Sequence, residues 1–460
     1  RNHKMRKVKN LIIGFGKAGK TLAGNLANHG EEVVLVEESE MMYGGTCINV
    51  ACIPSKAMEY AGRLAKNEAG DFAEKAHTYL EAVNNKRVLT AALRSKNYEK
   101  VVNSGAEVML GKASFIGEKQ VEVLHQDGSK DELEAERIFI NTGSRPFIPP
   151  IPGLKDASHA YTSEGMLDLD KLPKKLIILG GGYIGLEFAS FYANFGSEVT
   201  IIQDSEDFIP REDPEISEAV LKDLLNRNIK VLKSTKTLEV INTEDGIKLN
   251  IENKDGLTSI EANALLIATG RRPNVQDLNV EKAGIKLTPR GAIEVDEKLK
   301  TSVENIWAMG DVAGGLQFTY ISLDDYRIVQ AQLFSDGKRT NQNRGYVPYS
   351  VFIEPPLSRV GMSEPEAIKA GYKVKIAKLP AMAIPKAKIL KQQNGLLKAI
   401  IDADTNLILG AHLYMVDSHE VINLVKIAMD AKLPYTVLRD AIYTHPTMSE
   451  ALNDLFGSVK

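Results

Sequence analysis

The sequence predicts an α/β fold. It contains two units of similar design, in each of which a strand runs into a glycine-rich turn and a helix, and then a C-terminal α+β unit. The first unit begins with the apolar run Leu11–Ile13, which leads directly into Gly14, and the second begins with Leu176–Leu179, which leads into Gly180. From Val347 onward the pattern changes to alternating strands, a proline pair and helices. A chain of 460 residues is too long for a single core, so several domains are expected.

The composition is ordinary for a soluble globular protein and argues against two classes of partner. Hydrophobic residues make up 43% of the chain and charged residues 25%. The formal net charge of −3 provides no basic surface for a nucleic acid, and no apolar run approaches the roughly 18 residues of a membrane span. The only cysteines, Cys47 and Cys52, are too few for the disulfide framework of a secreted protein. We therefore expect a cytoplasmic protein that binds neither nucleic acid nor membrane.

The first glycine-rich turn has the spacing of a dinucleotide-binding unit. Gly14, Gly16 and Gly19 lie between the first strand and a helix, and a second strand ends about 20 residues later in Glu37. The first glycine permits a tight turn, the second lets the backbone approach a pyrophosphate, and the third lets helix and strand pack closely. The acid can accept a hydrogen bond from a ribose hydroxyl. Strand, turn, helix and acid together predict dinucleotide binding.

A second unit of the same kind follows at Gly180, Gly182 and Gly185. Two such units predict that two dinucleotides bind at once. The strand that should end in an acid ends instead in Gln203. An acid there holds the ribose diol of NADH and repels the 2′-phosphate of NADPH. Gln203 removes that repulsion and favours NADPH, but no arginine adjoins it, so NADH stays open.

The two cysteines lie in the stretch Gly44–Lys56, five residues apart at the start of a predicted helix. In an ideal helix their Cα atoms would be roughly 8–9 Å apart, which is too far for a disulfide. A redox pair therefore requires a distorted first turn. A helix N-terminus lowers the pKa of a thiol, and Lys56 adds a cation one turn later. Most free cysteines are small buried hydrophobic residues, but the flanking Gly-Gly and Pro-Ser-Lys and the absence of other cysteines favour a redox pair.

The remaining chain predicts a helical region over residues 65–105 and a sheet over 106–140 that ends before Thr142 and Gly143. The second unit closes in the same way, with a strand and a Thr-Gly ending at Gly270. A later short strand ends in Gly-Asp and places Asp311 at a strand end, where ligands bind in open α/β sheets. Helices are predicted over 418–431 and 435–441, before His445-Pro446-Thr447-Met448-Ser449-Glu450.

Together these motifs resemble the class I pyridine nucleotide–disulfide oxidoreductases, the flavoproteins that include glutathione reductase, lipoamide dehydrogenase and mercuric reductase. The cysteine stretch and the terminal His-Pro-Thr…Glu carry the resemblance, which extends over essentially the whole chain. It implies a glutathione reductase-like fold with two Rossmann-like domains and a C-terminal α+β dimerisation domain. The implied divisions are an FAD-binding domain in two parts (1–149 and 274–344), an NAD(P)-binding domain (150–273) and the dimerisation domain (345–460).

The resemblance also implies a role for the redox residues. Cys52 would be the thiol nearest the flavin and Cys47 the thiol that meets the substrate. Lys56 would pair with Glu187 beside flavin N5, and Tyr183 would gate the nicotinamide site. The implied FAD-binding residues are Gly14, Gly16, Gly19, Glu37, Gly45, Thr46, Lys56, Ala113, Thr142, Gly143 and Asp311, and the implied NAD(P)-binding residues are Gly180, Gly182, Gly185, Gln203 and Gly270.

The acid/base by resemblance is His445, oriented by Glu450. In the family this histidine comes from the partner subunit, which implies a homodimer with composite active sites. One departure is Ala51, where the family usually has glycine before the second cysteine. Alanine is tolerated there unless the position needs a positive φ, so the departure concerns local geometry.

Two dinucleotide sites and a dithiol make an electron relay from NAD(P)H through FAD to a Cys47–Cys52 disulfide. The thiolate of Cys47 would then attack an oxidised small molecule, because thiolate rather than thiol is the nucleophile. His445 would keep Cys47 deprotonated and protonate the leaving group. No resident metal is expected.

The substrate is suggested by a narrower resemblance. Residues 314–327, 355–362 and 416–420 resemble the reactive-chlorine-resistance flavoproteins, which are associated with reduction of hypothiocyanous acid. The chain has no C-terminal cysteine pair, which argues against mercuric reductase and high-molecular-weight thioredoxin reductase. Reduction of glutathione-like disulfides, of lipoamide or of copper(II) stays open, since a reduced dithiol is a soft copper ligand. A flavin-bound redox sensor without turnover is the non-enzyme alternative.

Overall fold

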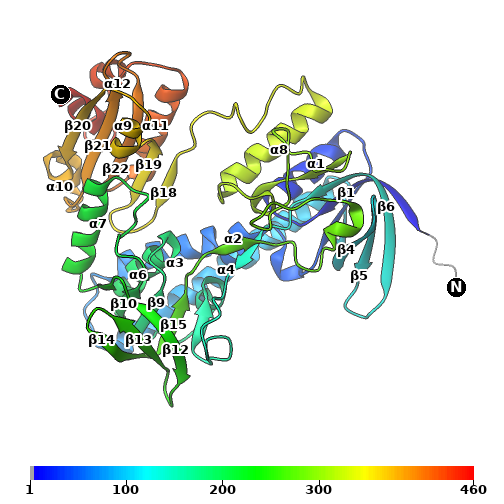
Figure 1. Cartoon of the computed structure of the whole chain (residues 1–460), viewed down its shortest axis with the longest axis horizontal. Helices are drawn as coiled ribbons and strands as arrows, with labels where there is room; N and C mark the ends of the chain where they lie inside the picture. The colour runs from blue at the N-terminus through cyan, green and yellow to red at the C-terminus, as the bar shows by residue number, and fades with distance from the viewer. Residues whose placement is uncertain (1–4) are drawn as a thin grey trace.

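The first glycine-rich unit forms most of a seven-stranded sheet (Figure 1). The structure is a computed structural model and describes residues 5–460. The strand order is β3-β2-β1-β6-β5-β4, and β17 also pairs with β6. The central strand β1 is buried over Leu11–Ile13, as expected for a parallel strand covered on both faces. The strands are β1 (Arg6–Ile13), β2 (Val33–Glu37), β3 (Glu107–Leu110), β4 (Lys112–Gly117), β5 (Gln120–Leu124), β6 (Lys130–Ile140) and β17 (Ile306–Ala308).

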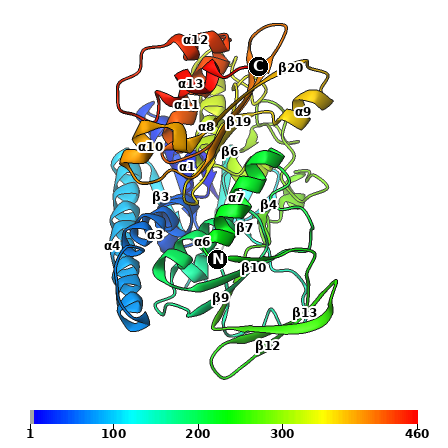
Figure 2. The ribbon, with the colours of Figure 1, turned by 90° about the vertical axis from the view of Figure 1, so that its left-hand side faces the viewer.

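Helices around this sheet include one within the helical region predicted over residues 65–105. That helix is α4, 32 residues long, which stands along one edge of the molecule in Figure 2. Helices α1 and α8 pack against each other, and α3 packs against both α4 and α6 of the next unit. The bounds are α1 (Lys17–Asn28), η1 (Glu40–Met42), α2 (Thr46–Val50), α3 (Cys52–Ala65), α4 (Phe72–Asn103), η2 (Val280–Ala283), η3 (Gly310–Ala313) and α8 (Thr319–Phe334).

The second glycine-rich unit builds an all-parallel sheet of order β11-β10-β9-β15-β8. A three-stranded antiparallel sheet, β12–β14, lies beside it, and the sequence analysis assigned no structure to that segment. The bounds are β8 (Ala160–Thr162), α5 (Ser163–Leu167), β9 (Lys175–Leu179), α6 (Tyr183–Phe195), β10 (Glu198–Ile202), α7 (Pro214–Asn226), β11 (Lys230–Leu232), β12 (Lys236–Asn242), β13 (Ile247–Asn253), β14 (Gly256–Ala262) and β15 (Ala264–Ile267).

Two short antiparallel strands, β7 (Ser144–Pro146) and β16 (Arg271–Pro273), join the two units. β7 lies where the chain leaves the first sheet, and β16 lies where the chain leaves the second unit. The two segments that connect the units therefore hydrogen-bond to each other. The predicted domain boundaries fall close to these strands and remain predictions. Strand β17, at residues 306–308, returns to the first sheet and pairs with β6.

The C-terminal unit is an antiparallel sheet of order β18-β19-β22-β21-β20 with helices packed on it. The two predicted helices are present as α11 and α12. No helix among residues 5–460 is long and apolar enough to cross a membrane. The bounds are β18 (Tyr349–Val351), β19 (Leu357–Gly361), α9 (Glu364–Lys369), β20 (Val374–Pro380), η4 (Ala381–Ala383), α10 (Pro385–Ile389), β21 (Leu396–Asp402), β22 (Ile408–Tyr414), α11 (Ser418–Asp430), α12 (Tyr435–Asp440) and α13 (Ala451–Gly457).

A buried lysine joins this C-terminal sheet to the second unit. The side chain of Lys398, on β21, is 1% exposed, and its Nζ lies 3.1 Å from Asp213 and 2.8 Å from Glu215 at the start of α7. Its third partner is Glu364, at 2.5 Å. Burial lowers the pKa of Lys398, but the three carboxylates outweigh this effect and raise it. The lysine therefore stays charged at the junction.

Replacing Lys398 with Met should destabilise the protein by about 3–5 kcal/mol, because buried Asp213 would lose its counter-charge. Thermal melting followed by far-UV circular dichroism should show a melting temperature lower by several degrees. The matched control is Lys378→Met, because Lys378 pairs with the same Glu215 from a side chain that is 46% exposed. We expect that change to cost at most about 1 kcal/mol. Equal effects of the two substitutions would contradict a special role for the buried charge.

Candidate active site

The cysteine stretch folds as the spacing requires, with a break between the two thiols. Helix α2 ends at Val50, and α3 begins at Cys52. Ala51 between them has φ −137° and ψ −102°, which is not helical. The predicted distortion of the first turn is therefore present. Because φ at this position is negative, alanine fits where the family usually has glycine.

The two thiols differ in acidity. The hydrogen bond from Cys52 is the main cause that lowers the pKa of Cys47 to about 6, and Thr319, Lys20 and Lys56 contribute in the same direction. The same bond, together with burial, raises the pKa of Cys52. The Sγ of Cys52 lies 3.7 Å from Thr319 Oγ1 at the start of α8. In the reduced protein Cys47 is thus the thiolate at neutral pH, and Cys52 keeps its proton.

The cysteine stretch packs directly on the first glycine turn. Gly45 has φ +95°, and a Cβ there would lie 2.6 Å from the Cα of Gly16. The neighbouring Gly44 accepts a hydrogen bond of 3.0 Å from Lys20 Nζ, on α1. Only glycine permits both this φ and this approach. Thr46 follows at once and starts α2, so the dithiol lies against the turn that is expected to hold a pyrophosphate.

Other predicted residues of the first site surround the same turn. Half-buried Glu37 accepts a hydrogen bond of 3.0 Å from Ser39 N, and the partial burial raises its pKa to about 7. Gly143 lies next to Thr46, since a Cβ on it would be 3.8 Å from the Thr46 hydroxyl. The Thr142 hydroxyl donates to Asn274 O at 2.7 Å. Ala113, on β4, is 9% exposed and belongs to the core beside the first sheet.

Asp311 lies in the turn after β17, where the sequence placed a carboxylate. It accepts a hydrogen bond of 2.9 Å from Ser144 Oγ. Ser144 Oγ in turn accepts one of 2.8 Å from Arg271 Nε. Burial raises the pKa of Asp311, and Ser144 and Arg271 oppose that rise. The carboxylate is therefore held by the pair of strands that joins the two units.

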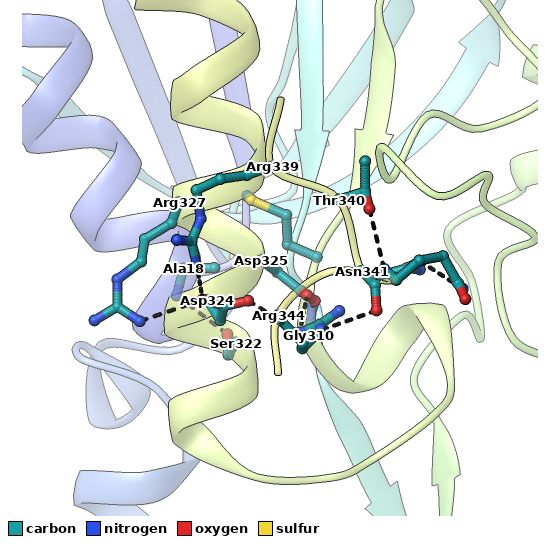
Figure 3. Close-up of polar contacts among 12 residues, drawn as sticks. Ala18, Gly310, Ser322, Asp324, Asp325, Arg327, Arg339, Thr340, Asn341 and Arg344 are labelled. Carbon is teal, nitrogen blue, oxygen red and sulfur yellow. Dashed lines mark hydrogen bonds and ion pairs between the residues drawn. The ribbon is translucent and has the colours of Figure 1, made fainter. Parts of the chain in front are cut away.

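A charge cluster on α8 fixes the backbone of that turn (Figure 3). Buried Asp325 accepts from Gly310 N at 2.8 Å and from Arg344 Nη1 at 3.0 Å. The neighbouring Asp324 pairs with Arg327 and Arg339, and both guanidinium groups reach toward it in the figure. One turn earlier, Ser322 Oγ accepts from Ala18 N at 3.2 Å and so touches the start of α1.

The second glycine turn leaves a helix N-terminus open. Helix α6 starts after Gly182, which provides no side-chain cap, and a Cβ on Gly182 would meet nothing within 4 Å. Gly180 needs its φ of +114°, because a Cβ there would lie 2.2 Å from the carbonyl oxygen of Ala268. Gly185 packs against Gly180, because a Cβ added to Gly185 would lie 2.7 Å from the carbonyl oxygen of Gly180. Gly270, with φ +111°, also faces open space.

Gln203 is used differently from the acid that it replaces. It is 6% exposed, and its amide nitrogen donates to the carbonyl oxygens of Ser205 (2.9 Å) and Asp207 (3.0 Å). Its Oε1 lies against Gly181, because a Cβ added to Gly181 would be 2.2 Å from that oxygen. The side chain therefore shapes the loop after β10 and presents no negative charge to the second glycine turn.

The pair implied between Lys56 and Glu187 is present. Lys56 Nζ donates to the two carboxylate oxygens at 2.6 and 3.1 Å. Glu187 also accepts a hydrogen bond of 3.0 Å from Phe352 N, and the Lys56 ammonium lies 4.9 Å from the centre of the Phe352 ring. Three segments distant in sequence meet here.

His445 and Glu450 also pair, but away from the thiols. His445 Nδ1 lies 2.8 Å from Glu450 Oε1, and Thr447 N donates to Oε2 at 2.8 Å. The hydrogen bond from His445 is the main cause that lowers the pKa of Glu450. The His445 side chain is 68% exposed, and no hydrogen bond within residues 5–460 joins it to Cys47 or Cys52.

Residues 8–325 match the family model described as pyridine nucleotide-disulphide oxidoreductase, and residues 347–456 match the dimerisation domain of the same family. The chain belongs to this family. It is 47% identical over 458 residues to the probable pyridine nucleotide-disulfide oxidoreductase RclA of Escherichia coli, which covers 99% of this chain and 100% of that relative. It is 34% identical over 449 residues to a mercuric reductase of Bacillus cereus, with 96% of this chain and 70% of that relative covered.

Among solved structures, the Cu(II) complex of the HOCl-induced flavoprotein disulfide reductase RclA from Escherichia coli matches with a TM-score of 0.93 at 46% identity. It covers 98% of this chain and 99% of that chain. The glutathione reductase-like fold is therefore confirmed. As a member of the family, the protein is an NAD(P)H- and FAD-dependent oxidoreductase that acts on a sulfur group.

The residues present fit both cofactors of the family. Helices α1 and α6 each start at a glycine without a side-chain cap, Gly16 and Gly182, so their first N–H groups are free to bind a pyrophosphate. An acid ends β2 at Glu37, as a ribose hydroxyl requires. Among residues 5–460 no group of three or more His, Cys, Asp or Glu side chains is arranged to hold a metal ion.

The sequence analysis missed Asn141, which organises the first glycine turn. Its Oδ1 accepts a hydrogen bond of 3.0 Å from Gly19 N, and its Nδ2 donates to Met309 O at 2.8 Å. A Cβ on Gly16 would lie 2.6 Å from the same Oδ1. A buried amide thus ties the turn to β17. Its position at the end of a buried strand, directly before Thr-Gly, was the available signal.

The acidity of Cys47 predicts a pH-dependent labelling rate. Iodoacetamide should alkylate the reduced protein faster as the pH rises, with a midpoint near 6, because only the thiolate reacts. Thr319→Val should move the midpoint upward, since the Thr319 hydrogen bond lowers the pKa of Cys47. Mass spectrometry of labelled peptides measures both. The fast phase should be lost in Cys47→Ser, and a midpoint near 8.5 in the unsubstituted protein would contradict the assignment.

Proposed function

We propose that the protein is an NAD(P)H-dependent flavoprotein reductase that passes electrons through a Cys47–Cys52 disulfide to hypothiocyanous acid. The observation that carries the proposal is the placement of the two thiols: Cys47 lies in the short helix α2, Cys52 begins α3, and the non-helical Ala51 separates the two helices. The hydrogen bond between the thiols lowers the pKa of Cys47 and raises the pKa of Cys52. Such a pair attacks a small electrophilic sulfur with one thiol and resolves the product with the other.

Each chain residue has a defined task in this mechanism. When bound, NAD(P)H and FAD supply the two electrons that open the disulfide. Lys56, held by Glu187, would place its ammonium group beside flavin N5, and Tyr183 would cover the nicotinamide site. Thr319 would hold a hydrogen bond to the thiol pair, and Asp311 would hold the ribityl chain of FAD.

The oxidant half-reaction balances with the two thiols alone. The Cys47 thiolate attacks the sulfur of HOSCN, forming Cys47–S–SCN and releasing hydroxide. The Cys52 thiol then attacks the Cys47 sulfur, releases thiocyanate and a proton, and closes the disulfide. Two electrons leave the dithiol, and the products are thiocyanate, water and the disulfide. A substrate of this size needs only a narrow approach to Cys47.

His445 would act on the partner's thiol in a homodimer. The match of residues 347–456 to the dimerisation domain supports this arrangement. The His445 ring is exposed and held by Glu450, and no hydrogen bond within residues 5–460 joins it to the thiols of its own chain. Ile442, three residues earlier, is fully exposed. An exposed apolar side chain beside a preorganised histidine fits a surface that a second copy covers.

The relatives support a role in oxidative stress. The solved RclA structure is described as an HOCl-induced flavoprotein disulfide reductase, and hypothiocyanous acid belongs to the same chemistry of oxidised halogen and pseudohalogen species. We extend that role to this chain because the two sequences align over nearly their full lengths.

Copper(II) is a second candidate substrate, favoured by the Cu(II) complex of that relative. In this chain copper would be substrate, because residues 5–460 contain no preformed cluster of metal ligands. The reduced Cys47–Cys52 pair is the soft ligand set available.

NADPH is the coenzyme we favour. Gln203 is neutral and presents no charge that would repel a 2′-phosphate. NADH remains the alternative, since no lysine or arginine within residues 5–460 hydrogen-bonds to the Gln203 side chain. Comparing kcat/KM for the two coenzymes distinguishes them.

Turnover assays with the holoenzyme test the proposal. NADPH or NADH oxidation should be fastest with hypothiocyanous acid, compared with oxidised glutathione, lipoamide and copper(II). Cys47→Ser should abolish turnover and retain the FAD absorbance. Cys52→Ser, the matched control, keeps the nucleophile and should stop after one equivalent with a thiocyanate adduct on Cys47. Absence of turnover with every oxidant would favour a redox sensor, and a clear preference for oxidised glutathione would refute the substrate.

Mixed dimers test the composite site. Cys47→Ser and His445→Gln variants should each be nearly inactive. Unfolding and refolding them together should restore part of the activity, because each mixed dimer then contains one site with both Cys47 and a histidine from the other subunit. Failure of the mixture to regain activity, with mixed dimers demonstrated by mass spectrometry, would place the histidine outside the site.

A further inference from the structure

Glu212 is a buried carboxylate that has no part in the mechanism above. Its side chain is fully buried, in the turn that precedes α7. One oxygen, Oε1, accepts hydrogen bonds from the hydroxyls of Tyr183, at 2.5 Å, and of Tyr349. The other, Oε2, has no hydrogen-bond partner among residues 5–460 and lies 3.7 Å from Arg359 Nη1. Two tyrosines thus share one buried anion.

The turn that carries Glu212 is fixed to the C-terminal sheet. Arg359, on β19, donates to the carbonyl oxygen of Arg211 at 2.6 Å. Asp213 bonds to Lys398 on β21 and accepts from Glu364 N at 3.2 Å. Backbone and side-chain contacts therefore hold the residues on both sides of Glu212, so the carboxylate is the stationary end of its hydrogen bonds.

Tyr349 is also held in place. It lies on β18, and its ring stacks on Phe318 with centroids 6.0 Å apart and planes 13° apart. Phe318 stacks in turn on Tyr320 at 5.0 Å. Tyr349 is therefore packed between the carboxylate and the start of α8.

Tyr183 has more freedom. It is the first residue of α6, directly after Gly182, where open space surrounds the backbone. Its side chain is half-buried, and its ring is tilted against Tyr349 at 5.8 Å. Burial and the charge of Glu212 raise the pKa of Tyr183, so its hydroxyl stays protonated and donates. Besides its packing on the core and on Tyr349, this side chain is held by its hydrogen bond to Glu212.

We propose that Glu212 is a positioning residue that latches Tyr183 closed, so that binding of the nicotinamide coenzyme must break the Tyr183–Glu212 hydrogen bond. The inference rests on the proposed function, in which Tyr183 gates the nicotinamide site. Hydrogen bonds to a charged acceptor are the stronger kind. A latch of this kind multiplies the apparent association constant of the coenzyme by the fraction of molecules in which Tyr183 is open.

Calorimetric titration of the oxidised holoenzyme with NADP⁺ and with NAD⁺ tests the latch without turnover. Tyr183→Phe keeps the ring and removes the hydrogen bond, so the preferred nucleotide should bind roughly tenfold more tightly. Glu212→Gln should give a smaller gain, because a neutral amide oxygen still accepts from Tyr183. The double variant should bind no more tightly than Tyr183→Phe alone, because both changes remove the same contact.

Tyr414→Phe is the matched control. Tyr414, on β22, donates a hydrogen bond of 2.6 Å to Asp223, on α7, so it is another tyrosine–carboxylate pair at the same junction. Within residues 5–460 no hydrogen bond or aromatic pair joins Tyr414 to Tyr183 or Glu212, so this change should leave nucleotide affinity unchanged. Anaerobic stopped-flow reduction of the flavin gives a second readout. There the latch variants should lower the NAD(P)H concentration needed for half-maximal rate, and Tyr414→Phe should not.

The outcomes separate the two proposals. Unchanged or weaker nucleotide binding by Tyr183→Phe, in a holoenzyme whose flavin NAD(P)H still reduces, would overturn the latch alone. A wild-type holoenzyme that neither coenzyme reduces would overturn the proposed function. If Glu212→Gln fails to fold because Arg359 loses its counter-charge, Tyr183→Phe decides the question by itself. A gain shared by Tyr414→Phe would mark a general loosening of the junction and would also overturn the latch.

Discussion

Glu187 is the side chain at which the three parts of the chain meet, and the arrangement of the site depends on its contacts. Its carboxylate accepts from Lys56 on α3 and from the backbone of Phe352 beside the C-terminal sheet, while its own helix starts at the second glycine turn. Its side chain is only 13% exposed, so loss of the lysine would leave a partly desolvated anion. The contacts of Glu187 therefore hold the dithiol helix, the second glycine turn and the C-terminal unit in fixed relative positions.

The parts of the site that depend on local backbone chemistry could be predicted from the sequence. The glycine spacing predicted both turns, and the structure shows why Gly14 and Gly180 must be glycine: each has a positive φ and lies against a carbonyl oxygen. The distance rule for disulfides predicted the break that occurs at Ala51. The pairing of Lys56 with Glu187 came from the family resemblance, since no local pattern connects residues 131 positions apart.

Contacts that exist only after folding could not be predicted in this way. Asn141 reads as one more polar residue before Thr-Gly, and its role becomes visible only when Gly19 and Met309 lie on either side of it. Buried Lys398 follows the same logic, because a lysine in an apolar strand predicts exposure until three carboxylates from other elements surround it. The role of Glu212 is the hardest to predict, since residues 210–214 have the composition of a polar surface turn.

The start of α8 connects the two ends of the proposed electron relay. Thr319 lies beside the Cys52 sulfur, and the preceding residue, Phe318, stacks on Tyr349, which shares an oxygen of Glu212 with Tyr183. Packed interiors shift between discrete arrangements more readily than they deform. Displacement of Tyr183 would leave Glu212 Oε1 bonded to Tyr349 alone, and Tyr349 packs against the residue next to the dithiol contact. In the proposed mechanism, coenzyme entry and thiol chemistry thus share one short segment of backbone, and substitutions at Phe318 would affect both half-reactions.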